Sequence, residues 1–248
     1  MLHSFSRTEL AIGPEGIAAL KGSSVAVLGI GGVGAMAAEA LARSGVGRII
    51  LVDKDVVDIT NINRQIHALT TTVGQKKADL MKERIRLINP ECDAIALNMF
   101  YTEETSEQFF QYPLDYVLDA SDTISYKIHL IKQCLARGIP IISSMGAANK
   151  MDPTQFRVAD ISETSMDPVA RVVRQKLRKD GIYKGVKVVF SPEQPLKPRE
   201  DITEQIVSDN APDIRKAQQP PASNAFVPPV AGLIMVSVVV QDLVRMKK

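Results

Sequence analysis

The chain has 248 residues, with 30 lysines and arginines against 28 aspartates and glutamates, for a formal net charge of +2. A charge so close to balance does not in itself indicate a nucleic-acid partner, so any basic surface must come from local clustering. The length allows one large α/β domain, or one domain with an appendage, to bury its own core.

The two cysteines, Cys92 and Cys134, lie far apart, and neither belongs to a Cys-x-x-Cys pair. This excludes a four-cysteine zinc site, argues against a disulfide scaffold and fits a reducing cytosol. Residues 1–20 show no apolar signal segment. The longest apolar run, 227–240, is broken by prolines and a serine; we expect it to be too short for a bilayer and to form a buried helix or strand. We therefore expect a cytoplasmic protein with no membrane partner.

Helical and strand-like segments alternate over the first half of the chain, after a helical segment at residues 1–22. The expected strands are 24–28, 48–52, 94–99, 116–120 and 139–143, and the expected helices are 33–43, 76–88 and 125–137. The opening strand, glycine turn, helix and strand form a βαβ unit. Such alternation predicts an α/β, Rossmann-like, doubly wound fold with a mostly parallel sheet covered on both faces.

Beyond residue 150 the pattern changes. Asp167 and Pro168 are typical of a helix N-cap and a first helical residue, and they predict a helix over 168–179 that is rich in basic residues. A strand is expected at 185–190. The proline-rich stretch 191–224 predicts a long loop, which is usually functional, mobile or partly disordered.

Residues 29–34 read Gly-Ile-Gly-Gly-Val-Gly between the first strand and the first helix of the βαβ unit. Glycines let the backbone approach a phosphate, and the N-terminus of the next helix offers free N–H groups and a positive dipole end. A turn that needs glycine only for packing is the alternative. The context favours a nucleotide site with Gly29, Gly31, Gly32 and Gly34, but it does not separate NAD, FAD and ATP.

Acidic residues follow the second strand and the strand at 116–120. Asp53 lies at a strand end where an acid commonly binds a ribose, although it could simply cap that end. For Asp55 and Asp58 a role without a ligand has at least equal weight. Asp122 could hold Mg²⁺ through water, or it could cap the helix that follows it.

A cluster of cations and amides separates this chain from an ordinary dehydrogenase. Arg64 and Lys77, with Asn61, could clamp a triphosphate, because arginine binds phosphate through paired hydrogen bonds and lysine adds a point charge. From the residues alone, each could equally be a solvated surface charge.

Taken together, these segments resemble the adenylating domain of ubiquitin-activating-like enzymes over about residues 5–150. The matching segments are 29–34, 53–55, 61–65, 74–77 and 118–122. The resemblance implies that the chain binds ATP and Mg²⁺, and that Asp53 binds the ribose. It assigns the phosphates to Asn61, Arg64 and Lys77 and the metal ion to Asp122.

The resemblance also adds residues whose roles are less direct. Asp55 and Gln65 lie in the matching segments and are counted among the ATP-binding residues. Arg7 matches an arginine that, in homodimeric members, reaches the nucleotide of the neighbouring subunit. Arg7, Arg64, Lys77 and Asp122 are therefore the expected catalytic residues. Some relatives bind a monovalent cation, for which this sequence identifies no site.

The second half narrows the resemblance. Members that activate sulfur-carrier proteins typically have two Cys-x-x-Cys pairs and often a thioester cysteine, which this chain lacks. Segments 167–178 and 223–233 instead resemble the tRNA threonylcarbamoyladenosine dehydratase branch. This implies a homodimer in which residues 1–150 form the ATP-binding adenylating domain. Residues 151–248 would be an extension of the same fold for tRNA binding and dimerisation, and a sulfurtransferase-type partner stays open.

The helix at 168–179 agrees with a tRNA partner. Arg171, Arg174 and Arg178 are spaced to place three guanidinium groups on one face, and Lys176 and Lys179 add to the charge. Phosphate backbones attract such clusters. A solvated helix face is the alternative, and the choice of RNA over DNA depends on the resemblance.

The implied reaction is an ATP-dependent dehydration of threonylcarbamoyladenosine in tRNA. The threonyl carboxylate is adenylated, and the neighbouring ureido group closes a ring and expels AMP. Such an intramolecular attack gains from proximity and needs no enzyme nucleophile. Adenylation of the C-terminal glycine of a ubiquitin-like sulfur carrier is the alternative with the same chemistry. A nicotinamide-dependent oxidoreductase and a non-catalytic protein that senses nucleotide and binds RNA are alternatives from other classes.

Overall fold

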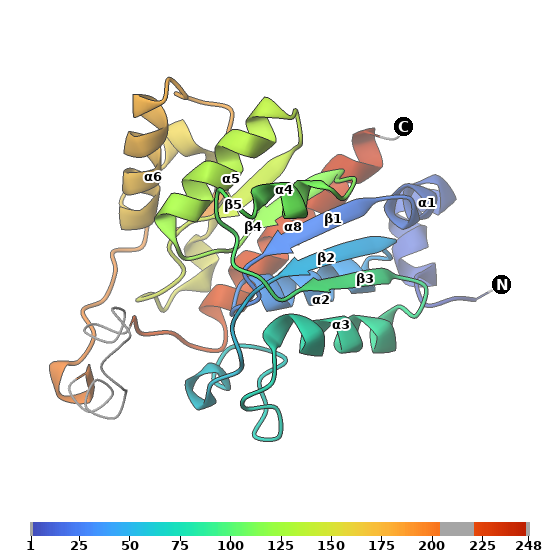
Figure 1. The fold of residues 1–248 in the computed structure, drawn as a ribbon, viewed down its shortest axis with the longest axis horizontal. Helices are drawn as coiled ribbons and strands as arrows, with labels where there is room; N and C mark the ends of the chain where they lie inside the picture. Colours follow the sequence, from blue (N-terminus) through green and yellow to red (C-terminus); the bar gives the residue numbers. More distant parts are fainter. Residues whose placement is uncertain (1, 204–220, 247–248) are drawn as a thin grey trace.

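A seven-stranded sheet orders the molecule in the computed structural model, which describes residues 2–203 and 221–246 (Figure 1). The strands are β1 (Ser24–Leu28), β2 (Arg48–Val52), β3 (Asp93–Leu97), β4 (Tyr116–Asp119), β5 (Ile141–Ser144), β6 (Arg157–Asp160) and β7 (Lys187–Phe190). Their order is β3-β2-β1-β4-β5-β7-β6, and every neighbouring pair is parallel except β6 with β7. The predicted Rossmann-like fold with a mostly parallel sheet is confirmed.

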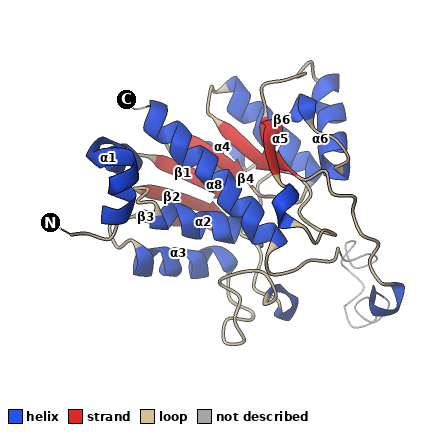
Figure 2. Ribbon diagram, turned by 180° about the vertical axis from the view of Figure 1, so that it is seen from behind, coloured by secondary structure: helices blue, strands red, loops and turns tan. Residues whose placement is uncertain are grey.

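Helices cover both faces of this sheet. They are α1 (Ser6–Lys21), α2 (Gly34–Arg43), α3 (Lys77–Ile88), α4 (Ser106–Phe110), α5 (Ile124–Ala136), α6 (Pro168–Lys179) and α8 (Val227–Met246). Short 3-10 turns lie at η1 (Ile59–Asn61), η2 (Pro153–Gln155) and η3 (Ile161–Glu163). Helices α1, α2, α3 and α8 lie on one face (Figure 2), and α4, α5 and α6 lie on the other.

Strand β1 shows why its sequence is apolar without alternation. Val25 and Val27 point into the core beneath α2, α3 and α8, whereas Ala26 and Leu28 point into the core beneath α5 and α6. All of its residues are buried. A parallel strand covered on both faces needs apolar side chains at every position, which explains this continuous run.

The apolar run near the C-terminus forms helix α8. Pro228 and Pro229 lie in its first turn, where a missing N–H removes no helical hydrogen bond. The helix continues to Met246, so the expectation that the run is too short for a bilayer was wrong. Among the described residues, α8 is the one helix long and apolar enough to cross a membrane by length and composition. Half of its most apolar part is buried inside the protein. It packs across α2 and against β5 and β7, so in this fold it is a core helix.

Other boundaries differ modestly from the expected ones. Strand β3 covers Asp93–Leu97 instead of 94–99, and α4 and the edge strand β6 were not predicted. Helix α1 is interrupted at Gly13, whose φ is 74°, directly before Pro14. Of the stretch 191–224, residues 204–220 lie outside the described residues.

The contact between α2 and α8 predicts an unusual effect of alanine at Gly232. A Cβ atom at this position would lie 2.3 Å from the Val33 carbonyl oxygen. Replacing a helical glycine by alanine normally stabilises a helix by about 1 kcal/mol, but overpacking here should lower the free energy of unfolding by at least about 2 kcal/mol. Chemical denaturation of Gly232→Ala measures this. Ser237→Ala, at an exposed position of the same helix, is the control, and a Gly232→Ala protein as stable as the parent would contradict the packing described.

Candidate nucleotide-binding site

The glycine turn lies where the strand order reverses, at the carboxyl ends of β1 and β4. Gly29 follows β1 with a φ of +86°, and a Cβ atom there would lie 2.8 Å from the Ala120 carbonyl oxygen just after β4. In doubly wound folds, ligands bind in the crevice that opens at this point. The glycine turn therefore lies at the point where such folds bind their ligands.

The four predicted glycines are required for different reasons. A Cβ on Gly34 would lie 1.8 Å from the Gly29 carbonyl oxygen, so the protein itself forbids a side chain there. A Cβ on Gly32 would be tightly packed, at 3.0 Å from Cβ of Pro228 and 3.2 Å from Cγ of Arg64, and these side chains would have to shift slightly. At Gly31 the nearest atom is Nε2 of Gln65 at 4.0 Å, and φ is not positive. The protein's own packing therefore does not require glycine at Gly31, whereas a ligand that approaches the backbone would.

Asp53 is fixed beside this turn. One carboxylate oxygen accepts a hydrogen bond from the Ile30 N–H at 2.7 Å, and the other accepts from the Asp55 N–H at 2.8 Å. Burial raises the pKa of Asp53, and these hydrogen bonds and the nearby Lys77 oppose the rise. The carboxylate thus caps the strand end and also faces the crevice, so the two interpretations from the sequence are compatible.

Lys77 is the first residue of α3 and is buried, and its Nζ lies 3.6 Å from a carboxylate oxygen of Asp55. Asn61 is also buried, and its Oδ1 accepts from the Asp58 N–H at 3.1 Å. Asp58 in turn caps η1 by accepting from the Thr60 N–H. The loop between β2 and α3 therefore uses Asp58 and Asn61 for its own structure, and Lys77 is partly neutralised by Asp55.

Arg64 has a different environment. Its Nη1 donates to the Thr60 carbonyl oxygen at 2.9 Å and to Oδ1 of Asn63 at 2.8 Å. The side chain is half-buried, and burial lowers the pKa of its guanidinium. No carboxylate in the described part of the chain forms an ion pair with it, and its Nε and Nη2 are not engaged there by protein groups. Asp58 attracts this cation at longer range and opposes the fall of its pKa, but it forms no hydrogen bond with it. A half-buried guanidinium beside a glycine turn that keeps Nε and Nη2 for further hydrogen bonds is suited to an anionic ligand.

Two buried polar side chains next to Arg64 carry unsatisfied atoms. Gln65 is 5% exposed, and its Oε1 has no hydrogen-bond partner among the described residues. His67 is 4% exposed, and neither of its ring nitrogens has a partner in that part of the chain. Burial, with smaller contributions from Lys77 and Arg84, lowers the pKa of His67 to about 4. Gln65 was predicted to belong to the site; His67 was not.

Asp122 lies past the end of β4 and is exposed. The N-cap of the following helix is Thr123, so the interpretation of Asp122 as that cap was wrong. The Thr123 hydroxyl donates to Oδ1 of Asp122 at 3.3 Å. Within the described residues, no three histidine, cysteine, aspartate or glutamate side chains gather as metal ligands. A single carboxylate such as that of Asp122 is compatible with Mg²⁺, since this ion is usually held by one or two carboxylates together with the phosphates of a substrate and water.

A buried ion pair that the sequence analysis missed closes the floor of the crevice. Lys127 Nζ lies 2.6 Å from Asp119 Oδ2, and both side chains are at most 1% exposed. The hydroxyl of Ser143 donates to the same Asp119 oxygen at 2.6 Å, and the Ser121 hydroxyl and N–H donate to the other. Lys127 also donates to the Ser144 carbonyl oxygen at 3.0 Å. With its hydrogen bonds satisfied, the pair joins the ends of β4 and β5. Asp119 lay in a matching segment, whereas Lys127 was not singled out from the sequence.

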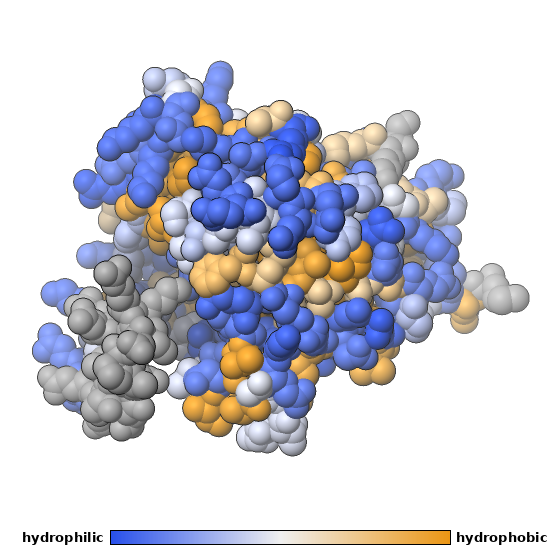
Figure 3. All heavy atoms as spheres, viewed as in Figure 1, coloured by the Kyte–Doolittle hydropathy of each residue, from blue (hydrophilic) through white to orange (hydrophobic). Residues whose placement is uncertain are grey.

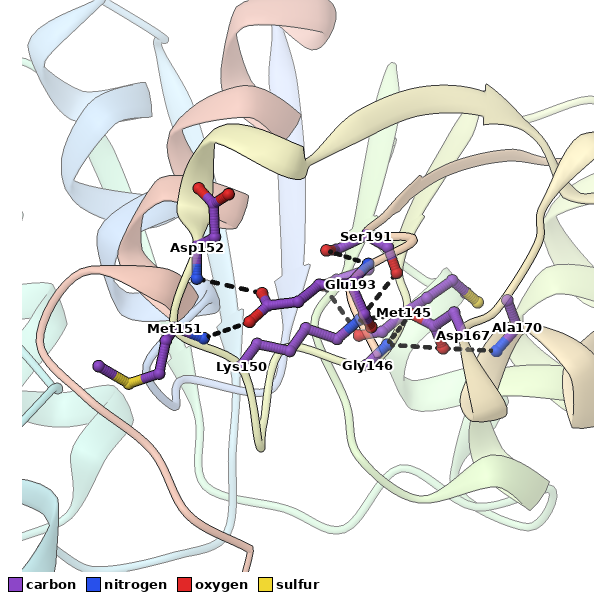
Figure 4. A network of polar contacts seen from close by, with 10 residues as sticks. Met145, Gly146, Lys150, Met151, Asp152, Asp167, Ala170, Ser191 and Glu193 are labelled. Carbon is purple, nitrogen blue, oxygen red and sulfur yellow. Dashed lines mark hydrogen bonds and ion pairs between the residues drawn. The ribbon is translucent and has the colours of Figure 1, made fainter. Parts of the chain in front are cut away.

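A second buried network fixes the loop that follows β5 (Figure 4). Lys150 Nζ donates to the carbonyl oxygens of Ser191 and Glu193 at 2.8 and 3.2 Å, and it lies 3.7 Å from Asp167. Asp167 accepts from the Ala170 N–H, which confirms it as the N-cap of α6, and also from the Gly146 N–H. The network therefore ties the start of α6 to the loop beside the crevice, and the local sequence gave no sign of it.

The two thiols are poorly suited to nucleophilic catalysis. Cys92 and Cys134 are both buried, and burial raises the pKa of the first to about 11 and of the second to about 12. Only the thiolate is a good nucleophile. The expectation that the chain has no thioester cysteine agrees with this environment.

The remaining predicted residues lie outside the crevice. Arg7 is exposed on α1, and the ring of Phe5 lies beside Gly45, before the amino end of β2, whereas the glycine turn lies at the carboxyl end of the strands. Arg171, Lys176, Arg178 and Lys179 are exposed on α6, where Figure 3 shows mainly hydrophilic side chains. Arg174 departs from the expected exposed face: it is half-buried and donates to the carbonyl and hydroxyl oxygens of Thr164.

Comparison with known proteins gives the class of protein. A sequence model of the ThiF family matches residues 5–247, so the chain belongs to the ThiF family. It is 70% identical to the tRNA threonylcarbamoyladenosine dehydratase of Bacillus subtilis (strain 168) over 245 residues, or 99% of this chain and 96% of that protein. It is 42% identical to the Escherichia coli (strain K12) protein of the same name over 206 residues, or 80% of this chain and 77% of that protein.

Solved structures agree with this assignment. The crystal structure of the E. coli tRNA N6-threonylcarbamoyladenosine dehydratase in complex with ATP has a TM-score of 0.87 and 36% identity, covering 98% of this chain and 94% of that chain. Both the fold and the family of this chain are therefore established.

The lowered pKa of His67 predicts a loss of stability in acid. Because the folded-state pKa is about 4 and the ordinary value is 6.5, the unfolded chain binds a proton first as the pH falls. The contribution of His67 is present at pH 7 and is lost between about pH 6.5 and pH 4, by about 3 kcal/mol. Denaturant unfolding of the parent and of His67→Gln at several pH values measures this. The free energy of unfolding should fall less for the variant, and parallel pH curves would contradict a buried neutral imidazole.

Proposed function

We propose that this chain dehydrates threonylcarbamoyladenosine in tRNA to its cyclic form in an ATP-dependent reaction. The half-buried Arg64 guanidinium beside the glycine turn, whose Nε and Nη2 are not engaged by any described protein group, is the observation that carries the adenylation chemistry. The tRNA substrate is supported by the names of the relatives, which this chain matches over nearly its whole length in one case. ATP as a substrate is supported by the similar structure solved with ATP.

Different residues of the crevice would bind the ribose and the phosphates of ATP. Asp53 accepts from the ribose hydroxyls, since its carboxylate is held in place by two backbone N–H groups and keeps further lone pairs. Gly31 and Gly32 let the backbone approach the phosphates. Arg64 and Lys77 neutralise phosphate charge, and Asn61, Asp55 and Gln65 complete the lining through the loop that carries them.

Asp122 would hold Mg²⁺ at the open side of the crevice. The ion would supply electrostatic stabilisation of the charge that develops on the phosphates. Asp119 is not an alternative ligand, because both of its oxygens already accept hydrogen bonds from buried neighbours.

The proposed chemistry has two steps. An oxygen of the threonyl carboxylate bonds to the α-phosphorus of ATP, and the bond to pyrophosphate breaks. The ureido group of the same nucleoside then bonds to the activated carbonyl carbon, loses a proton, and the bond to AMP breaks. The nucleoside has lost one water, and its carboxylate oxygen leaves with AMP. Because the second attack is intramolecular, the buried cysteines are not needed.

The proposal also covers how tRNA binds and how two copies of the chain assemble. Exposed Arg171, Lys176, Arg178 and Lys179 on α6 would contact tRNA phosphates, with residues 151–248 as the substrate-binding extension of the adenylating domain at 1–150. A second copy would bring Arg7 of the partner subunit to the nucleotide. Between β2 and α3, exposed apolar side chains lie beside the crevice and suit such a contact: Val56, Ile59, Ile62, Leu69 and Val73. The same proposal places the protein in the cytoplasm. It also includes a sulfurtransferase-type protein partner and a bound monovalent cation.

Mass spectrometry of the product nucleoside tests the function. Incubation with Mg·ATP and tRNA that carries threonylcarbamoyladenosine should remove one water from that nucleoside and release AMP in equal amount. In Arg64→Ala or Asp122→Ala, turnover should fall by about 100-fold or more, because charge on the reacting phosphates is no longer stabilised. Arg86→Ala is the matched control: Arg86 is exposed on α3, and Glu83 is its one ion-pair partner among the described residues.

Circular dichroism should show that each variant keeps the fold. Normal turnover in a folded Arg64→Ala or Asp122→Ala protein would refute the assignment of that residue. An unchanged nucleoside with the parent protein would refute the dehydratase. AMP release that depends on a small ubiquitin-like protein would then favour the sulfur-carrier adenylase.

The exposed cations of α6 give a separate expectation. The double variant Arg171→Ala/Arg178→Ala should raise KM for tRNA about tenfold at moderate salt, because two contacts with tRNA phosphates are lost. The Kd for Mg·ATP should not change, because both side chains lie on α6 outside the crevice. The slope of tRNA affinity against salt concentration should also become shallower. The control is Lys82→Ala/Arg86→Ala on α3, at the other end of the sheet. Equal tRNA affinity of the α6 variant and the parent would place the tRNA elsewhere.

A further inference from the structure

The guanidinium of Arg64 is held by two groups of its own loop. One is the Thr60 carbonyl oxygen, and the other is Oδ1 of Asn63 at 2.8 Å. Both contacts use Nη1, so they fix the orientation of the guanidinium and leave Nε and Nη2 able to donate to a ligand. The placement of the charge beside Gly32 therefore depends on the side chain of Asn63.

Asn63 is itself held from the C-terminal part of the chain. Its Nδ2 donates to the carbonyl oxygen of Ser223 at 3.0 Å, across 160 residues of sequence. A single amide thus contacts Arg64 with its oxygen and Ser223 with its nitrogen. The two partners also fix the orientation of the amide, because a guanidinium can only donate and a carbonyl oxygen can only accept.

Residues 221–226, here called the strap, are anchored to the loop after β5. The Ala222 N–H donates to Oδ1 of Asn149 at 2.7 Å, and the Asn149 N–H donates to the Ala222 carbonyl oxygen at 2.8 Å. Asn224 Nδ2 donates to the Lys150 carbonyl oxygen at 2.8 Å, and Asn224 Oδ1 accepts from the Val227 N–H at the start of α8. Asn149 has a φ of 59°, so its backbone is held in a conformation that few residues adopt.

The same loop is connected to the basic helix. Lys150 is buried against the backbone of residues 191–193, and Glu193 accepts from the N–H groups of Met151 and Asp152 (Figure 4). Asp167, the N-cap of α6, accepts from the Gly146 N–H. A continuous set of contacts therefore runs from the start of α6 through the loop at 146–152 and the strap to Asn63 and Arg64.

We infer, on the basis of the proposed phosphate-binding role of Arg64, that Asn63 is a positioning residue that couples the strap and the start of α6 to the nucleotide site. The residue does not touch the reacting atoms. It holds the guanidinium at the phosphates only when the strap is seated on Asn149. The segment at 223–233 is thereby part of the ATP site as well as of the proposed tRNA-binding extension.

A double-mutant cycle tests this coupling through binding of Mg·ATP, measured by calorimetry without tRNA. Asn63→Ala removes the contact with Arg64 and should raise the Kd for Mg·ATP about tenfold, the loss of one charge-assisted hydrogen bond. Binding of adenosine, which has no phosphate, should not change. Asn149→Gly is compatible with the positive φ, removes the acceptor for the Ala222 N–H, and adds backbone freedom at the point where the strap is held.

Asn149→Gly should raise the Kd for Mg·ATP about threefold in the parent and have no further effect in Asn63→Ala, because contacts in one network are not additive. Asn98→Ala is the matched control: Asn98 is an exposed asparagine whose amide donates to Asp79. Equal effects of Asn149→Gly in both backgrounds, or none in either, would overturn the coupling. An unchanged Kd in Asn63→Ala would overturn the positioning role.

The outcomes also separate this inference from the proposed function. A parent protein that does not bind Mg·ATP would refute the function together with the role of Arg64. A parent that binds Mg·ATP but leaves the tRNA unchanged would refute the dehydratase, and the cycle would still decide the role of Asn63.

Discussion

The close approach of α2 to its neighbours is the constraint on which the rest of the structure depends. Gly34 leaves no room for a Cβ atom against the Gly29 carbonyl oxygen, and Gly232 leaves none against the Val33 carbonyl oxygen. The start of α2 is therefore held between the glycine turn and α8. This fixes the helix N-terminus, with its positive dipole end, at the crevice between β1 and β4. A helix from the far end of the chain is thus needed to place the first helix of the nucleotide site.

Charge balance around this crevice explains which side chain is left for a ligand. Asp119 and Lys127 neutralise each other in the core, Asp53 is satisfied by backbone N–H groups, and Asp55 lies near Lys77. Arg64 keeps its charge without a protein carboxylate within ion-pair distance in the described residues. Burial without such a partner is costly for a cation unless an anion binds. Asp58 offsets part of this cost by charge attraction at longer range. This environment is the reason for which we propose Arg64 as a phosphate-binding residue.

Local patterns in the sequence predicted the elements and part of the site, and long-range contacts account for the rest. The βαβ unit and the cap at Asp167 follow from short-range rules that the structure bears out. Lys127 was not singled out from the sequence, because its burial depends on Asp119 across a turn and on Ser143 from another strand. The prolines of α8 suggested an interruption, although the first turn of a helix tolerates them. Asn63 lay in the matching segment 61–65, but its contact with Ser223 could not be predicted, because the two residues are far apart in the sequence.

The described residues of the second half of the chain have no core separate from that of the first half. Strand β7 pairs with β5, α8 covers α2, and the loop at 146–152 is held by residues 191–193. A boundary at residue 150 therefore separates two segments with different proposed roles that share one core.

A core shared by both halves of the chain suits the proposed chemistry. An intramolecular ring closure needs no enzyme nucleophile, but it requires the carboxylate of one substrate and the α-phosphate of the other to be held in one fixed geometry. A single core shared by both halves, joined at the crevice by Asn63, is a direct way to keep two substrates in register.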